Sequence, residues 1–316
     1  MMKKKIKFSV AIPTYKDKFL KETIDSVLSQ SYQDFELIIV NDASPYDIDS
    51  IVSQFDDCRI LYFKNEKNCG AKDVVDNWNI CLSKSSGDYF ICIGDDDKLK
   101  PNCLSDFFNL ICKYPDFEVF HSQTEIIDED SNFVQLLERR PEWESVFSLI
   151  YSINDSGLGS YLYKTETLRK NGGFYKLPYG WSSDFISAFM AAEVYGIVNT
   201  QVPGFQYRGN GMSISHDMTG IEDKIIANLR AKEWIDSFVS NKDANNERDK
   251  KFKDAIPLSI CKTTNQKNDD LVEFDIRKDF FNRSLFWLIR RKKYDISFVR
   301  YLKCLIKSLK YRYKHN

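Results

Sequence analysis

Apolar segments of strand length alternate with helix-patterned segments through the first hundred residues, and this alternation restricts the fold more than any other feature of the chain. Strands are predicted at residues 8–12, 35–40, 59–63 and 89–93. Because buried strands joined by helices pair in parallel, the pattern predicts an α/β fold with a mostly parallel sheet and helices on both faces.

Four segments should meet at one edge of this sheet. Ligands of open α/β sheets bind beyond the carboxyl ends of the strands. In this chain those ends are residues 13–15, 41–42, 64–72 and 94–97. Binding residues are therefore expected in these segments.

The later parts of the chain are patterned differently. Residues 101–220 mix helices with several short strands, and we interpret them as a second half that shares the core of residues 1–100. From residue 221 to 316 the pattern is helical, with a polar break at 240–250. The expected organisation is one α/β domain over residues 1–220, followed by a helical C-terminal extension.

The acidic run Asp95-Asp96-Asp97 follows Gly94 directly after a predicted strand. Adjacent carboxylates repel one another unless a cation or hydrogen-bond donors offset their charge. Hard oxygen ligands suit Mg²⁺ or Mn²⁺, which commonly keep waters and bridge to substrate phosphates. Taken alone, the run fits a solvated acidic turn equally well.

Three stretches together resemble the inverting glycosyltransferases of family 2, which have the GT-A fold. They are Phe8-Ser-Val-Ala-Ile-Pro-Thr-Tyr15, Asp34-Phe-Glu-Leu-Ile-Ile-Val-Asn-Asp-Ala-Ser44 and Gly87-Asp-Tyr-Phe-Ile-Cys-Ile-Gly-Asp-Asp-Asp97. The resemblance covers roughly residues 6–215. It implies a nucleotide-binding half at 1–100, an acceptor-binding half at 101–220 and a nucleotide-sugar donor, with uridine favoured by family frequency.

The resemblance also implies the donor-binding residues. Asp42 matches the carboxylate that hydrogen-bonds the base, although an Asp before Ser and Pro is also a common turn residue. The other donor-binding residues implied in this way are Pro13, Thr14, Tyr15, Asn68, Gly70, Lys72, Asp95 and Arg208. Lys72 and Arg208 are expected near the diphosphate, although a solvated Lys is the ordinary alternative.

The acidic run departs from the family's commonest form, Asp-x-Asp-Asp, because Gly94 holds its first position. Aligning the strand ends makes Asp96 the direct metal ligand and Asp97 a second or water-mediated ligand. His216 is a further candidate ligand, although a lone His is more often structural. The expected cofactor is Mn²⁺ or Mg²⁺, which would neutralise the departing diphosphate.

An inverting transfer needs a base to take the proton of the acceptor hydroxyl. Asp184 matches the second acid of the family's acidic pair, where Ser183 replaces the first. A helix N-terminal Asp that offsets the macrodipole is the alternative. Trp181 is expected to stack on an acceptor sugar, and Gly159 to allow close approach of an acceptor, unless it is a turn glycine.

Charge is nearly balanced overall but concentrated at the C-terminus. The formal net charge is −1, yet thirteen Lys or Arg and only two acids, Asp279 and Asp295, lie from Arg277 onward. This basic, aromatic tail fits either an anionic membrane surface or a helix packed on the catalytic domain with its basic face in water. No nucleic-acid partner is expected.

Other classes of protein lack their defining features here. The first strand is followed by no GxGxxG, and the chain has no GxxxxGK[ST], which argues against dinucleotide and P-loop enzymes. Eight cysteines without a CxxC pair argue against structural zinc and fit a reducing cytoplasm, and no secretory segment is predicted. The predicted protein is a cytoplasmic or peripheral membrane glycosyltransferase of surface polysaccharide or lipopolysaccharide synthesis, acting on a saccharide or lipid-linked acceptor; the alternative is an inactive nucleotide-sugar-binding protein.

Overall fold

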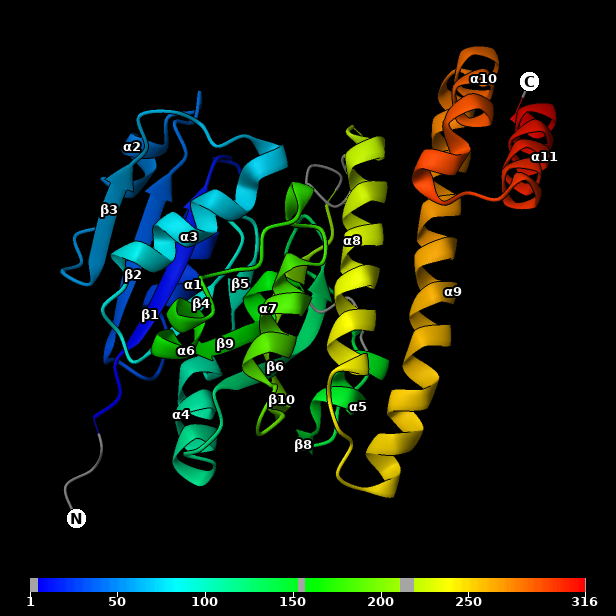
Figure 1. The fold of residues 1–316 in the computed structure, drawn as a ribbon. Coiled ribbons are helices and arrows are strands. Elements are labelled where there is room, and N and C mark those ends of the chain that lie inside the picture. Colours follow the sequence, from blue (N-terminus) through cyan, green and yellow to red (C-terminus); the bar gives the residue numbers. More distant parts are fainter. Residues whose placement is uncertain (1–4, 153–156, 211–218, 316) are drawn as a thin grey trace. The chain divides into compact units, whose positions relative to one another are not determined.

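The chain forms two compact units. The computed structural model describes residues 5–152, 157–210 and 219–315. The first unit comprises Met1–Lys176 and Ser183–Asp217, and the second comprises Leu177–Ser182 and Met218–Asn316 (Figure 1). The short segment 177–182 therefore belongs to the second unit although it lies within the sequence of the first.

The first unit is built on one sheet, with strands in the order β3-β2-β1-β4-β9-β6-β10-β5; β7 pairs with β6, and β8 with β10. Its strands are β1 (Phe8–Thr14), β2 (Phe35–Asn41), β3 (Ile60–Lys64), β4 (Tyr89–Cys92), β5 (Lys98–Leu99), β6 (Val119–Ile127), β7 (Phe133–Leu136), β8 (Trp143–Glu144), β9 (Tyr161–Lys164) and β10 (Ile197–Arg208). The four strands predicted from the sequence are β1 to β4.

Strand direction differs between the two halves of the sheet. Strands β3, β2, β1 and β4 are parallel, as the alternating pattern predicts. Strand β9 is antiparallel to both β4 and β6, and β5 is antiparallel to β10, whereas β6 and β10 are parallel. The fold is thus a mixed α/β sheet of the GT-A kind, with antiparallel pairing confined to the later strands.

Helices cover the sheet. In the first unit they are α1 (Leu20–Leu28), α2 (Ile48–Val52), α3 (Val74–Lys84), α4 (Cys103–Lys113), α5 (Val146–Tyr151), α6 (Thr165–Lys170) and α7 (Ser183–Ala191), with short 3₁₀ turns η1 (Ala71–Asp73) and η2 (Leu158–Ser160). Helix α3 packs on β1, β2 and β4, α4 packs on β6 and β10, and α6 and α7 pack on β9.

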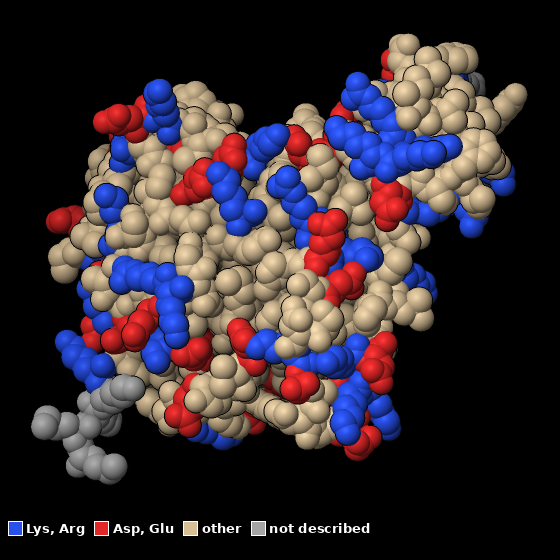
Figure 2. Space-filling model, in the orientation of Figure 1, with Lys and Arg blue, Asp and Glu red and all other residues tan. Residues whose placement is uncertain are grey.

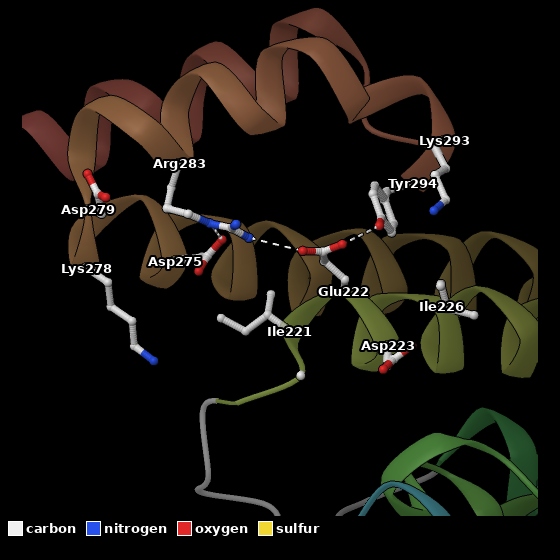
Figure 3. A pocket seen from close by; sticks show the side chains of 11 residues that line it. Ile221, Glu222, Asp223, Ile226, Asp275, Lys278, Asp279, Arg283, Lys293 and Tyr294 are labelled. Atoms are coloured by element: carbon white, nitrogen blue, oxygen red, sulfur yellow. Dashed lines mark hydrogen bonds and ion pairs between the residues drawn. The ribbon is translucent and has the colours of Figure 1, made fainter.

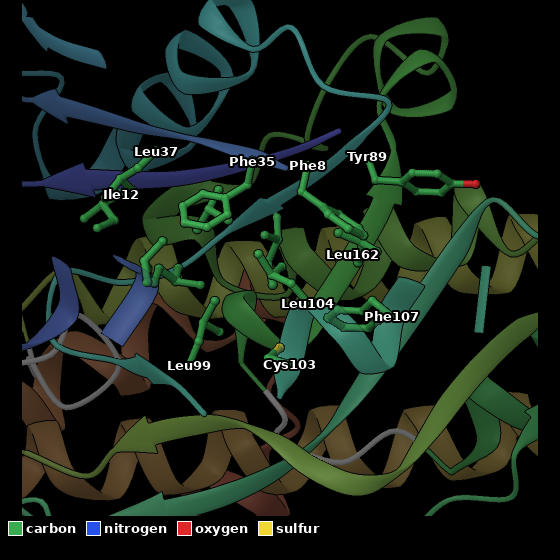
Figure 4. Packing of buried hydrophobic residues seen from close by; sticks show 14 of the residues in the cluster. Phe8, Ile12, Phe35, Leu37, Tyr89, Leu99, Cys103, Leu104, Phe107 and Leu162 are labelled. Carbon is green, nitrogen blue, oxygen red and sulfur yellow. The ribbon is translucent and has the colours of Figure 1, made fainter. Parts of the chain in front are cut away.

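Both faces of the central strands are buried, which explains their unbroken apolar sequence. Along β1, Phe8, Val10 and Ile12 lie in one large cluster with residues of α1 and α4, such as Leu104 (Figure 4). The intervening Ala11 is also fully buried and, by strand alternation, lies on the opposite face. A sheet buried in this way fixes the positions of its strand ends.

The second unit is helical, as predicted. It contains η3 (Pro178–Gly180), α8 (Ile221–Ser240), α9 (Glu247–Lys278), α10 (Phe280–Arg290), η4 (Arg291–Tyr294) and α11 (Phe298–His315). The predicted polar break at 240–250 is the connection between α8 and α9. Its separate core contains Ile225, Val272, Trp287, Tyr294 and Tyr301.

Candidate active site

The end of β1 and the acidic run after β4 are joined by hydrogen bonds. The backbone N–H groups of Tyr15 and Lys16 donate to one carboxylate oxygen of Asp95, at 2.8 and 2.7 Å. The hydroxyl of Thr14 lies 3.4 Å from the same oxygen. Strands β1 and β4 are neighbours in the sheet, so their carboxyl ends meet as predicted.

Asp42 follows β2 and is held from two directions. Its backbone N–H donates to the carbonyl of Thr14 at 2.9 Å. Its carboxylate accepts from the backbone N–H of Cys69 at 3.0 and 3.1 Å and from the side-chain amide of Asn65 at 2.8 Å. Because an ionised carboxylate has about four acceptor positions, Asp42 retains capacity for one further donor.

The loop after β3 contributes Asn65, which the sequence reasoning missed. Its amide bridges Asp42 and Asn77, so it fastens this loop to the end of β2 and to α3. The signal available in the sequence was an Asn placed directly after the β3 strand. Gly70 has a positive φ of 81°, a conformation that favours glycine, and both Asn68 and Lys72 are exposed.

Burial and mutual repulsion disfavour the charged form of two acids in the run. Burial, followed by the charge of Asp96, raises the pKa of Asp95 to about 6, although N–H groups of Tyr15 and Lys16 oppose the shift. The pKa of Asp97 is raised well above its ordinary value, first by burial and then by the charge of Asp96. A nearby cation would relieve this electrostatic cost.

Gly94 gives these carboxylates room. A Cβ atom added at Gly94 would lie 2.9 Å from a carboxylate oxygen of Asp96 and 3.0 Å from one of Asp97. A side chain at this position would therefore press on both acids. The structure thus gives a steric reason why a glycine, and not the acid of the family's commonest motif, suits position 94.

Asp96 and Asp97 differ in their surroundings. Asp96 is partly exposed, and one of its oxygens accepts from the side-chain amide of Asn210 at 2.7 Å. Asp97 is buried, with 5% of its surface exposed, and accepts from the backbone N–H of Arg208 at 3.0 Å. Asn210 was another residue missed from the sequence, although it lies only two positions beyond Arg208.

Arg208, which is expected near the diphosphate, makes its contacts in this structure with protein groups. Its side chain is fully buried and stacks 4.2 Å from the ring centroid of Phe19. The guanidinium donates to the carbonyls of Asp96, Asp128 and Glu129 at 2.7 to 3.0 Å and to the carboxylate of Glu22 at 3.1 Å. In this structure Arg208 therefore holds the acidic segment in place through protein acceptors.

The residues present suit a hard divalent cation that keeps other oxygen ligands. Among the described residues, no three His, Cys, Asp or Glu side chains gather as a metal cage. Asp95 and Asp96 are partly exposed, whereas Asp97 is buried, and the carboxylate of Asp96 borders the space at Gly94. Mg²⁺ and Mn²⁺ are commonly bound by one or two carboxylates together with substrate phosphates. His216 lies outside the described residues.

Asp184 lies in the first turn of α7 and is largely buried. One of its carboxylate oxygens accepts from the backbone N–H of Phe185, and its backbone carbonyl accepts from the hydroxyl of Tyr163 at 3.2 Å. Tyr163 is in β9, which pairs with β4. The sheet thus fixes the backbone that carries Asp184.

The two expected acceptor residues are in different units. Gly159, in the first unit, is buried where an added Cβ would collide with the ring of Phe205, so close packing requires a glycine there. Trp181, in the second unit, has the ammonium of the buried Lys224 lying 4.7 Å from its ring centroid. The neighbouring Ser182 has a positive φ of 68°.

A mixed α/β sheet with donors and carboxylates gathered beyond parallel strand ends is the architecture of a GT-A glycosyltransferase. The chain belongs to glycosyl transferase family 2, whose sequence pattern it matches over residues 9–178. This matched segment includes the strand-end residues described above, from Thr14 to Asp97.

Curated relatives of the chain include glycosyltransferases. An uncharacterised glycosyltransferase of Methanocaldococcus jannaschii is 31% identical over 139 residues, 42% of this chain and 46% of the relative. A GalNAc(5)-diNAcBac-PP-undecaprenol beta-1,3-glucosyltransferase of Campylobacter jejuni is 35% identical over 102 residues, 31% of this chain and 32% of the relative. The chain spans less than half the length of these relatives.

One solved structure has the same fold as this chain over nearly its whole length. S. aureus TarS residues 1–349 in complex with UDP-GlcNAc superpose with a TM-score of 0.63 and 17% identity, covering 96% of this chain and 92% of that one. At this identity the likeness concerns the fold. It includes the helical C-terminal region as well as the sheet.

Proposed function

We propose that this glycosyltransferase moves a sugar, with inversion, from a nucleoside-diphosphate sugar to a hydroxyl of a saccharide or lipid-linked acceptor in surface polysaccharide or lipopolysaccharide synthesis. The observation that carries the proposal is the hydrogen-bonded junction of Tyr15 and Lys16 with Asp95, beside Asp96. It gathers backbone donors and carboxylates at the edge where a donor diphosphate would bind.

In this proposal the donor is a UDP-sugar. The spare acceptor capacity of Asp42 takes an imide N–H of the base, and Asp95 faces the ribose with its second oxygen. Pro13, Thr14 and Tyr15 form one wall of the nucleotide site, and Asn68, Gly70 and Lys72 another. TarS was solved with UDP-GlcNAc and with UDP, which supports the choice of uridine.

The proposed enzyme is metal-dependent. Asp96 would bind Mn²⁺ or Mg²⁺, with Asp97 supporting it from its buried position and His216 as a further candidate ligand. The bound cation supplies the positive charge that the departing diphosphate requires. Arg208 keeps Asp96 and Asp97 in place, since it binds the carbonyl of the first and donates its backbone N–H to the second.

Asp184 is the proposed general base. It would take the proton of the acceptor hydroxyl while that oxygen bonds to the anomeric carbon and the bond from this carbon to the diphosphate oxygen breaks. Attack from the face opposite the leaving group inverts the anomeric configuration. The backbone near Gly159, in the first unit, is proposed to allow close approach of an acceptor. Trp181, in the second unit, is separately proposed to stack on an acceptor sugar. The lipid-linked substrate in the name of the Campylobacter jejuni relative supports an acceptor of this kind.

Replacing Asp96 tests the donor and metal site. A thermal-shift screen of nucleotide sugars should show stabilisation by a UDP-sugar with Mn²⁺, about 2.7 kcal/mol at a hundred times its Kd. The Asp96→Asn variant should lose this metal-dependent shift and about a hundredfold or more of donor hydrolysis or transfer. The exposed Asp116→Asn variant is the matched control and should keep both.

One outcome would contradict the active-enzyme proposal, and a different one would contradict the metal-binding role of Asp96. If wild type is stabilised by a UDP-sugar but neither hydrolyses nor transfers it with Mn²⁺, the chain is a nucleotide-sugar-binding protein without catalysis. If Asp96→Asn retains the metal-dependent shift and full turnover, Asp96 does not bind the metal.

Replacing Asp184 tests the chemical step separately. Asp184→Asn keeps a similar volume but cannot accept a proton, so transfer should fall by about 10²- to 10⁴-fold while the thermal shift with donor is unchanged. Steady-state kinetics should place the loss in kcat, with KM for the donor kept. Unchanged turnover would exclude Asp184 as the base.

A further inference from the structure

Helices α10 and α11 are anchored within the second unit by one face only. Trp287 of α10 and Tyr301 and Cys304 of α11 are buried in the core of this unit. The indole N–H of Trp287 donates to Asp275 of α9 at 2.8 Å. These contacts fix the orientation of both helices and leave their remaining faces uncovered within the unit.

Polar contacts among residues that line a pocket strengthen this anchoring. Glu222 of α8 accepts from the hydroxyl of Tyr294 at 2.8 Å and from Arg283 of α10 at 3.4 Å (Figure 3). Arg283 also donates to Asp275 at 2.5 Å. These residues line a cavity of about 600 Å³. The ion pairs of Arg283 connect α10 to α8 and α9, and the hydrogen bond of Tyr294 connects η4 to α8. The two helices therefore rest on a fixed support.

The uncovered face of α11 is a continuous apolar stripe. Val299 is 62% exposed, Ile306 51% and Tyr313 88%. The stripe consists of Phe298, Val299, Leu302, Ile306, Leu309 and Tyr313. The spacing of three and four residues places them on one side of the helix, away from the buried Tyr301 and Cys304.

Helix α10 adds a second apolar stripe. Phe281 is 75% exposed and Ile289 70%, and Leu285 and Leu288 are also exposed. We call the two stripes together the α10–α11 face. Exposed apolar surface of this extent commonly marks a site of interaction with another molecule or a membrane.

The charges beside this face select its partner. From Phe280 to the end the chain has eleven Lys or Arg and one acid, Asp295. Lys303 and Lys310 are exposed and border the α11 stripe on the helix surface, and Lys and Arg gather beside the uncharged surface of this region in Figure 2. A face bordered by positive charges attracts anionic headgroups. The same face of a second copy of the chain has the same positive charges, so two such faces would repel each other.

We propose that the α10–α11 face docks onto an anionic lipid bilayer, with its apolar stripes in the headgroup region and its Lys and Arg side chains against lipid phosphates. No helix in the part of the chain that the structure describes is both long and apolar enough to span a bilayer, so the proposed contact is with the membrane surface. This inference extends the proposed function, because a lipid-linked acceptor is concentrated at the same surface.

Vesicle sedimentation of the full chain tests the proposal without donor or acceptor. The full chain should bind vesicles of phosphatidylcholine mixed with phosphatidylglycerol, and much less those of phosphatidylcholine alone. Leu302→Asn with Ile306→Asn should lower the partition coefficient roughly tenfold or more. Lys303→Gln with Lys310→Gln should also lower it roughly tenfold or more, since each cation near the surface adds to the attraction of anionic headgroups.

The matched control is Leu258→Asn, at a residue of α9 that is 77% exposed and lies outside the face. It should bind vesicles like wild type, and unchanged melting temperatures would show that every variant is folded. The proposal is overturned if wild type ignores anionic vesicles, or if the control loses binding equally. It is also overturned if light scattering shows that the face variants instead break a dimer.

The test of membrane binding can fail or succeed independently of the test of the proposed function. Donor-induced thermal stabilisation of the α10–α11 variants should equal that of wild type, because no residue of the face is part of the proposed nucleotide site. Lost lipid binding with intact donor binding is the expected result. Intact lipid binding in an Asp96→Asn protein would show that the membrane inference stands even where the catalytic proposal fails.

Discussion

At the scale of single residues, Gly94 shows how a departure from a family motif is accommodated. Family members with an acid at this position need space for it, and here that space is taken by the carboxylates of Asp96 and Asp97. The sequence identified the departure. Only the positions of the two neighbouring carboxylates explain why a glycine suits this chain.

Restoring the acid should therefore be harmful. Gly94→Asp adds a Cβ within 3.0 Å of two carboxylates and a third negative charge beside them, so the free energy of unfolding should fall by about 1–3 kcal/mol, as measured by urea denaturation. Gly94→Ala adds the Cβ without the charge and should have the smaller effect. Wild-type stability of Gly94→Asp would show that the acidic run can make room.

A second residue, Glu36, lies at the end of the sheet that is opposite to the site, and it stabilises that end. Its carboxylate accepts from Lys7 at 2.6 Å, from the Ser9 hydroxyl at 2.6 Å and from the backbone N–H of Ser86 at 2.6 Å. Burial raises its pKa, but hydrogen bonds from Lys7, Ser86 and Ser9 lower it further and hold it at about 2. The folded state therefore favours the ionised form.

This pKa predicts the pH dependence of stability. A folded-state pKa below the unfolded value of about 4.3 means that the stabilisation is complete above that pH and is lost as the pH falls toward 2. Glu36→Gln should cost about 2 kcal/mol near neutral pH, and the difference from wild type should shrink in urea titrations below about pH 4. The exposed Glu138→Gln should show no such trend, and a cost for Glu36→Gln that is independent of pH would contradict the assignment.

At the scale of elements, Arg208 connects segments that are distant in the sequence. It ends β10, and its guanidinium reaches Glu22 of α1, the carbonyl of Asp96 and the turn at 128–129 between β6 and β7. Burying a guanidinium is costly unless its donors are satisfied, as they are here by protein oxygens. Arginine suits this place because its planar group reaches several acceptors at once.

Arg208→Lys should separate this positioning role from a direct phosphate contact. Lysine keeps the charge but not the forked donors, so the free energy of unfolding should fall by about 3 kcal/mol or more. The exposed Arg139→Lys is the control and should change stability little. A variant at position 208 with normal stability but weakened donor binding would instead favour the diphosphate contact.

The positions of strands and helices were easier to predict from the sequence than any other part of the structure. The strands β1 to β4 and the break between α8 and α9 follow their predicted positions within a few residues, because strand and helix periods are local properties. The antiparallel strand β9 between β4 and β6 was not predicted, because the residues with which it pairs lie at least 40 positions away in the sequence.

At the scale of the whole molecule, the chain has an acidic part and a basic part as well as two separate apolar cores. With a formal net charge of −1 overall and a local excess of +11 from Arg277 onward, the preceding residues have a net charge of −12. The basic residues belong to the helical unit, which has its own apolar core. The basic segment visible in the sequence thus lies within one structural unit.

The sequence by itself determined the family, the α/β alternation, the acidic run at a strand end and the basic helical tail, because motifs and periodicity are written in neighbouring residues. Only the tertiary structure decided that Arg208 points into the protein, that Asn65 and Asn210 support the site acids, and which stripes of α10 and α11 remain exposed. Those properties depend on which distant segments fill the space around each side chain, and local sequence does not encode that packing.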